Sequence, residues 1–179
     1  MRVIAGTARG VPLTSPRDTL TRPITDRVKE TLFGILGERV VDARVLDLYA
    51  GSGAIGIEAL SRGAVTVTFV ERGRAALATL RNNLARTRLA DGAEVHAQDV
   101  MRWLASAQAE ARFDLAFLDP PYEERAILAP LERLAPLLAP GATVVVKHFW
   151  RTEVPPAEGL RPWRERRFGE TALTFLEVP

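Results

Sequence analysis

Apolar residues along the chain fall into two alternating patterns. Short continuous runs, bounded by glycine, proline or polar residues, favour buried β-strands and occur at 44–48, 65–70, 93–97, 113–118 and 142–148. Between these runs, apolar residues recur three and four positions apart, which predicts amphipathic helices at 25–36, 54–62, 73–88, 100–110 and 124–138. Thr25 is expected to be the N-cap of the first helix, because its hydroxyl can accept from a free backbone N–H.

The regular exchange of strand and helix predicts an α/β fold with a mostly parallel sheet. Both ends of the chain depart from this pattern. At the start, 2–5 and 11–14 flank a glycine-containing turn and are predicted to form a small β-hairpin. At the end, 162–168 and 171–178 are joined by Gly169-Glu170 and are predicted to form a closing hairpin that adds an antiparallel strand.

Composition predicts a single enzyme-sized domain. The 179 residues are 47% apolar and no long Gly/Ser/Pro linker divides them, so 1–179 is expected to share one core. The chain has no cysteine, which excludes disulfides and thiolate metal sites. No apolar run approaches the ~20 residues of a membrane span, and no apolar leader is visible, so a cytoplasmic protein is expected. His96 and His148 are interpreted as ordinary strand-end residues, with no metal site.

Asp119-Pro120-Pro121-Tyr122 follows the strand predicted at 113–118. Two prolines cannot continue a β-ladder, and they stiffen the backbone at the carboxyl end of the strand, where open α/β sheets bind ligands. The Asp119 carboxylate and the Pro120 carbonyl can both accept hydrogen bonds from an exocyclic amine, while the Tyr122 ring can stack on the base that carries it. These four residues are the predicted catalytic group.

A glycine turn follows the strand predicted at 44–48. Asp47 stands at the end of that strand, the turn is Ala50-Gly51-Ser52-Gly53, and a helix begins directly after it. Glycines without Cβ atoms let backbone N–H groups and a helix N-terminus come close to a ligand. We therefore predict a cofactor site here.

The turn also satisfies the dinucleotide fingerprint, because Gly51, Gly53 and Gly56 form G-x-G-x-x-G with Glu71 20 residues after Gly51. A nicotinamide cofactor is thus a competing hypothesis. Asp47 argues against it, since a carboxylate there would repel a pyrophosphate but attract the ammonium and sulfonium of S-adenosylmethionine. Glu71 at the next strand end could accept from two ribose hydroxyls. S-adenosylmethionine is the predicted cofactor.

Four acidic residues follow four strand ends. They are Asp47, Glu71, Asp99 and Asp119, and parallel strands bring their carboxyl ends to one edge of the sheet. For each acid, the alternative is the N-cap of the following helix. Asp114 opens its strand, so it is expected at the opposite edge in a structural role. Arg72 and Val100, next to two of these acids, are assigned to the cofactor site.

With these motifs the chain resembles the RsmD-type methyltransferases. The resemblance covers nearly the whole sequence and is most specific in Arg2-Val3-Ile4-Ala5-Gly6 and in the stretch 22–33. It implies a Rossmann-like class I methyltransferase fold with a seven-stranded, mostly parallel sheet and helices on both faces. It implies that Asp99 binds the adenine amino group. It also implies methyl transfer to the N2 amine of a guanine in bacterial 16S rRNA. The chain departs from the family pattern at Ile24, Gly34 and Lys147, the last where an acidic residue is expected.

Positive charge is concentrated at the two flanks. Residues 1–30 hold six basic and three acidic side chains, and 147–170 hold six basic and four acidic, whereas 31–146 hold 12 basic and 14 acidic. Such flanks suit phosphates, so 1–24 is interpreted as an RNA-contacting extension and 25–179 as the catalytic core. The predicted RNA contacts are Arg2, Arg9, Arg22 and Lys147.

The mechanism expected from these residues is direct in-line transfer. Asp119 and Pro120 orient the amine of a base splayed out of its stack, and Tyr122 takes over the stacking. A monomer is expected, acting on 16S rRNA in a small ribosomal subunit or assembly intermediate. Two alternatives stay open: an amine methyltransferase for DNA adenine, DNA cytosine or protein glutamine, and a non-catalytic RNA-binding or assembly protein.

Overall fold

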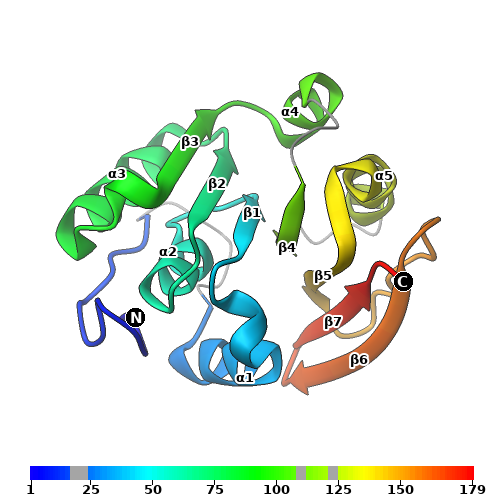
Figure 1. Cartoon of the computed structure of the whole chain (residues 1–179), viewed down its shortest axis with the longest axis horizontal. Helices are drawn as coiled ribbons and strands as arrows, with labels where there is room; N and C mark the ends of the chain where they lie inside the picture. Colours follow the sequence, from blue (N-terminus) through cyan, green and yellow to red (C-terminus); the bar gives the residue numbers. More distant parts are fainter. Residues whose placement is uncertain (17–23, 108–111, 121–124) are drawn as a thin grey trace.

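The computed structural model describes residues 1–16, 24–107, 112–120 and 125–179, with the side chains of 125 and 126 left out. Seven strands form one sheet in the order β3-β2-β1-β4-β5-β7-β6 (Figure 1). The strands are β1 (Arg44–Leu48), β2 (Thr66–Glu71), β3 (Ala93–Ala97), β4 (Phe113–Leu118), β5 (Leu138–Phe149), β6 (Arg161–Phe168) and β7 (Thr171–Glu177).

The first five strands run parallel and the last two run antiparallel to their neighbours. β7 lies between β5 and β6, so the closing hairpin inserts its second strand beside β5. The predicted Rossmann-like sheet is confirmed, including its antiparallel end. From β1 the strand order continues to β2 and β3 on one side and to β4 and β5 on the other. At such a switch point the carboxyl ends of neighbouring strands border a crevice, here those of β1, β2 and β4.

Helices cover both faces of the sheet (Figure 1). On one face, α1 (Asp26–Leu36), α2 (Ala54–Ser61) and α3 (Arg74–Thr87) share a buried cluster that includes Leu32, Ile57 and Leu80. On the other face, α4 (Val100–Ser106) and α5 (Arg125–Leu134) share a second one that includes Trp103 and Leu131. Short 3-10 turns lie at Gly37–Val40, Ala90–Gly92 and Ala135–Leu137.

Most predicted elements agree with the structure to within one or two residues. Thr25 caps α1 as expected, its side chain accepting from Val28 N–H. β5 begins four residues earlier than predicted, because Leu138 already pairs with Phe113 before an irregularity around Pro140-Gly141. α4 ends at Ser106, short of the predicted 110, and 108–111 lie outside the described residues. The last predicted turn of α5 is a 3-10 turn that contains Pro136.

The predicted amino-terminal hairpin is present as a short antiparallel pairing rather than as two full strands. An isolated antiparallel bridge joins Arg2 to Pro12, with Val3 N–H donating to the Val11 carbonyl and Leu13 N–H to the Met1 carbonyl. The segment also packs on the core, with Val3 fully buried. Gly6 has φ +83° and approaches Ser61 so closely that a Cβ would lie 1.6 Å from its carbonyl oxygen.

Glu58 of α2 anchors this segment. Its buried carboxylate accepts from the backbone N–H groups of Ile4 and Ala5 and forms ion pairs with Lys29 and Arg62. Lys29 also donates to the carbonyl of Arg2. Burial lowers the pKa of Lys29, an effect that the Glu58 carboxylate opposes. The amino-terminal segment is thus tied to α1 and α2 through one saturated carboxylate.

Candidate active site

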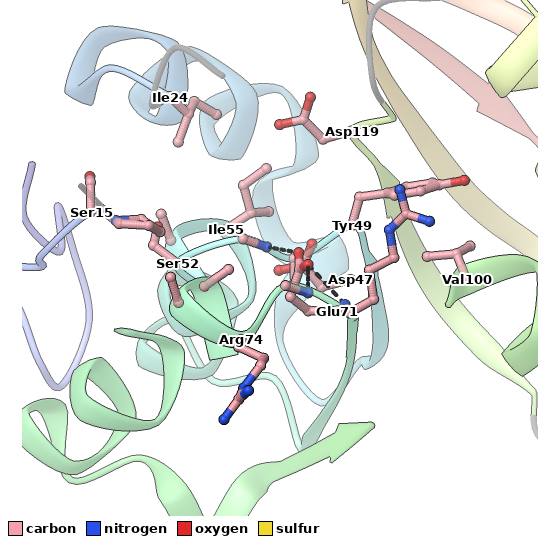
Figure 2. Close-up of a pocket in the computed structure, with 18 of the residues that line it drawn as sticks. Ser15, Ile24, Asp47, Tyr49, Ser52, Ile55, Glu71, Arg74, Val100 and Asp119 are labelled. Carbon is pink, nitrogen blue, oxygen red and sulfur yellow. Dashed lines mark hydrogen bonds between the residues drawn. The ribbon is translucent and has the colours of Figure 1, made fainter. Parts of the chain in front are cut away.

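A pocket of about 380 Å³ opens at the carboxyl ends of β1, β2 and β4. Figure 2 shows Asp47 and Glu71 together in it, with Asp119 and Ile24 toward one side and Arg74 toward the other. Eight of the predicted site residues line the pocket: Asp47, Ala50, Gly51, Ser52, Glu71, Arg72, Val100 and Asp119. These eight residues therefore lie together at one place in the fold, and their contact with a cofactor or substrate stays a prediction.

The turn after β1 has left-handed backbone at three positions. Tyr49, Gly51 and Gly53 have φ values of 60°, 56° and 76°. A Cβ on Gly53 would lie 2.2 Å from Leu80 Cδ1, so this glycine permits α3 to pack against the turn. Gly51 faces open space, its nearest such neighbour being 3.9 Å away, which lets a ligand approach the backbone. A bulky residue at positive φ, as at Tyr49, stores strain typical of functional turns.

Asp47 lies beneath this turn and is only 2% exposed. Its Oδ2 accepts from Gly56 N–H at 3.0 Å, which holds the first turn of α2 over the end of β1. Burial raises the pKa of Asp47 well above its ordinary value, and the nearby carboxylates of Asp119 and Glu71 raise it further, while the Gly56 hydrogen bond opposes the shift. A cationic ligand beside Asp47 would therefore stabilise the ionised form of this carboxyl group.

Glu71 braces the glycine turn from β2. Its carboxylate accepts from the N–H groups of Gly51, Arg72 and Gly73 at 2.7–2.9 Å. A carboxylate offers about four acceptor positions, so these bonds leave less capacity for two ribose hydroxyls than the sequence interpretation assumed. Contact of Glu71 with a cofactor stays a prediction.

Asp99 caps the helix that follows it. Its Oδ1 accepts from Met101 and Arg102 N–H, and its Oδ2 pairs with Arg72 at 3.2 Å. This is the N-cap alternative foreseen for each acid. Val100 lines the pocket but Asp99 does not, so its predicted contact with an adenine amino group is untested. Asp114, by contrast, accepts from Arg44 N–H at the opposite edge, which confirms its structural role.

Asp119 forms an ion pair that the sequence did not reveal. Lys147 Nζ lies 2.6 Å from Asp119 Oδ2, and the two side chains are 7% and 31% exposed. The Lys147 ammonium is thus buried and paired with Asp119, and its predicted RNA contact stays a prediction. Pro120 is buried. Pro121 and Tyr122 lie outside the described residues.

The remaining predicted RNA contacts belong to the amino-terminal segment. Arg2 and Arg9 are exposed, and Arg2 pairs with Asp26 at 3.4 Å. Arg22 lies outside the part of the chain that the structure describes. RNA binding by these arginines stays a prediction.

The sequence interpretation missed the wall that the amino-terminal segment adds to the pocket. Ser15, Pro16 and Ile24 line it. Asn83 on α3 holds this wall in place, accepting from Thr14 N–H and donating to the carbonyls of Thr14 and Ser52. Asn83 is fully buried, which is unusual for an amide side chain. Its partners are distant in sequence, so no local sequence pattern predicts these contacts.

Within the ranges that the structure describes, no three His, Cys, Asp or Glu side chains gather closely enough to hold a metal ion. No helix in those same ranges is long and apolar enough to cross a membrane.

Comparisons with known proteins identify the family of the chain. The family model "Conserved hypothetical protein 95" matches residues 1–177. YlbH of Bacillus subtilis (strain 168), named as a candidate rRNA methyltransferase, is 40% identical over 181 residues, 99% of this chain and 98% of that protein. Ribosomal RNA small subunit methyltransferase D of Escherichia coli (strain K12) is 45% identical over 122 residues, 68% of this chain and 60% of that protein.

A solved structure shares the whole fold. The Escherichia coli protein yhhF, described as a candidate methyltransferase, superposes with a TM-score of 0.87 at 38% identity, covering 99% of this chain and 97% of that one. Together with the family match, this similarity extends over the sheet, the glycine turn and the end of β4. The chain belongs to the conserved hypothetical protein 95 family, that of the RsmD-type methyltransferases.

Proposed function

We propose that this protein transfers a methyl group from S-adenosylmethionine to the exocyclic N2 amine of a guanine in bacterial 16S rRNA. The observation that carries the proposal is the position of Asp119. It stands at the end of β4, beside a pocket built on a glycine turn, with an acceptor oxygen facing the site. Relatives in Escherichia coli and Haemophilus influenzae are named ribosomal RNA small subunit methyltransferase D, which supports an rRNA substrate.

The pocket residues fit S-adenosylmethionine better than a dinucleotide. Asp47 is buried beside the carboxylates of Asp119 and Glu71, so a cation would be favoured next to it and a pyrophosphate would be repelled. Gly51 leaves space for close approach to the turn, and Ile55 and Val100 supply apolar wall. Bound here, the cofactor would supply an electrophilic methyl group.

Asp119 orients the amine in this mechanism. Lys147 holds Oδ2, and Oδ1 accepts no hydrogen bond from any described residue, so Oδ1 is the acceptor available to an amine N–H. The guanine N2 lone pair is delocalised into its ring. Acceptors aimed at both N–H groups favour the pyramidal geometry that attack requires and bind the positive charge that develops on nitrogen.

Proton loss completes the reaction. The methylated amine carries one proton too many, and Asp119 or a water molecule can take it after the methyl group has moved. The Pro120 carbonyl is the second acceptor in this proposal. Tyr122 would stack on the splayed base.

Other amine acceptors remain competing substrates, because adenine N6, cytosine N4 and a glutamine amide suit the same oxygens. Small ribosomal subunits lacking the modification, and protein-free 16S rRNA, would be incubated with labelled donor and the methyl group mapped by nuclease digestion and mass spectrometry. We expect a single N2-methylguanine. A label on adenine, on cytosine or on protein would refute the assignment, and no transfer with donor and RNA both bound would favour a non-catalytic binding protein.

A further inference from the structure

A cluster of two arginines on a tryptophan lies just beyond β5. Arg167 of β6 places its guanidinium carbon 3.6 Å from the centroid of the Trp150 ring, and Arg151 places its own at 4.8 Å. We call Trp150, Arg151 and Arg167 the Trp150 cluster. The ring is half-buried, whereas both arginines are exposed.

The backbone fixes this cluster from two strands. Trp150 N–H donates to the Glu170 carbonyl at 3.0 Å, which ties the end of β5 to the β6–β7 turn. Arg167 Nε donates to the Gly169 carbonyl at 2.8 Å. Stacking and the Nε hydrogen bond together restrain the Arg167 fork, so a ligand that binds it costs less side-chain entropy than one that orders a free arginine.

The cluster lies at the catalytic edge of the sheet. β4 and β5 are parallel, and Leu118 pairs with Val146, so the chain beyond β5 leaves on the same side as Asp119. Lys147 reaches Asp119 directly, and Trp150 follows three residues later, roughly 10 Å along an extended chain. The β6–β7 turn meets this point, because Phe149 and Phe168 both pair with Thr171.

Its chemistry matches nucleic acid. β6 carries four arginines and one glutamate, and all four arginines are exposed. β6 is also the outermost strand on its side of the sheet (Figure 1), and charge on an edge strand prevents edge-to-edge pairing. That function does not require Trp150 or Arg151, which lie in the loop after β5 rather than on the edge. Stacked arginine planes with exposed forks are suited to phosphates and to unstacked bases.

We propose that the Trp150 cluster binds the RNA strand next to the target nucleotide, its two guanidinium groups contacting phosphates. This inference rests on the proposed function, since it assumes that RNA is delivered to the Asp119 edge. The cluster then holds the backbone on one side of the pocket while the target base enters.

The test compares two charge-matched double variants. Arg151→Gln with Arg167→Gln removes the two cations of the cluster, and Arg81→Gln with Arg86→Gln removes two exposed cations from α3, near the other end of the sheet. RNA affinity would be measured across a salt series with protein-free 16S rRNA, and methyl transfer with the same RNA and with small subunits. Calorimetry with S-adenosylmethionine checks that each variant keeps its cofactor site.

We expect the cluster variant to lose at least about tenfold in RNA affinity and to flatten the slope of log affinity against log salt by about 1 to 2. The α3 variant should change affinity by less than about threefold. Equal losses in the two variants would overturn the proposal. So would normal binding to protein-free RNA with transfer lost only on assembled subunits, which would mean contact with a ribosomal protein. A wild-type protein that methylates no RNA would instead refute the proposed function.

Discussion

The two lysines of this chain are both paired with carboxylates, yet their surroundings differ. Lys29 and Glu58 are 3.1 Å apart with both side chains fully buried, and Glu58 also accepts from Ile4, Ala5 and Arg62. Lys147 and Asp119 are 2.6 Å apart, but Asp119 is 31% exposed and faces the pocket. The first carboxylate is saturated, whereas the Oδ1 atom of the second accepts no hydrogen bond from the described part of the chain and is open to a ligand.

This difference separates structural from chemical function. A buried ion pair whose hydrogen bonds are complete stabilises the fold, because removing one partner leaves the other charge buried and unpaired. A carboxylate held through one oxygen and open through the other can still accept from a substrate. The comparison predicts that variants of the two pairs will fail in different assays.

Breaking the saturated pair should give the largest effect. Lys29→Met leaves the Glu58 carboxylate with less charge compensation at full burial, and we expect a loss of about 3–5 kcal/mol in unfolding free energy. Urea denaturation measures this directly. Lys29→Arg serves as the control, because it keeps the positive charge and changes the shape of the side chain. A stability within 1 kcal/mol of wild type, on the scale of a surface pair, would remove the distinction between the two pairs.

Asp47 should show opposite effects on stability and on cofactor binding. Burial raises its pKa in the fold above the ordinary 3.8, so as pH rises past 3.8 the unfolded state ionises first and stability falls. Asp47→Asn has no titrating carboxyl group at this position, so its stability does not fall with pH for this reason. Without cofactor, the variant should match wild type near pH 4 and melt about 2–4 °C higher at pH 7, the shift expected for about 1 kcal/mol.

The same substitution should weaken binding of the cationic donor, by about tenfold for a lost charge contact of 1.4 kcal/mol. In wild type, affinity should rise with pH through the raised pKa of Asp47, because ligand binding favours the ionised carboxylate. Calorimetry in buffers of different ionisation enthalpy would detect the released proton. A wild-type affinity for the donor that does not change with pH would contradict the assignment of Asp47 as the carboxylate that binds the cation.

Breaking the open pair should affect stability least. In Lys147→Met, the partly exposed Asp119 can be hydrated, so we expect less than about 1 kcal/mol of stability change. Transfer should slow while cofactor affinity is kept, because the carboxylate loses the contact that orients it. A stability loss as large as that of Lys29→Met would show that the Lys147 pair is structural as well.

Local pattern predicted the parts of the site that lie on one segment. The strand at 44–48, the glycine turn after it and the strand at 113–118 each have a strong sequence signal, and the parallel sheet brings their ends together. Thr25 and Asp99 can be predicted as possible N-caps in the same way, because each lies at or directly before the start of a predicted helix.

Pairings between segments were not predictable. Lys147 meets Asp119 only because Leu118 pairs with Val146 across β4 and β5, and a shift of one residue would turn the lysine to the other face. The Asn83 contacts with Thr14 and Ser52 depend on how the amino-terminal segment packs on α3. The amino-terminal pairing stays short, and the close approach of Gly6 to Ser61 is another contact between segments distant in sequence.

The most direct test of the account is Asp119→Asn, which keeps the shape of the side chain and removes its charge. With small subunits that lack the modification, methyl transfer should fall by about 10²–10³, the range for a lost electrostatic contact to a transition state. Donor affinity, measured on the same preparation by calorimetry, should change by less than about threefold. A variant that transfers at the wild-type rate, or that loses donor binding in step with transfer, would contradict the assignment of Asp119 as the acceptor of the substrate amine.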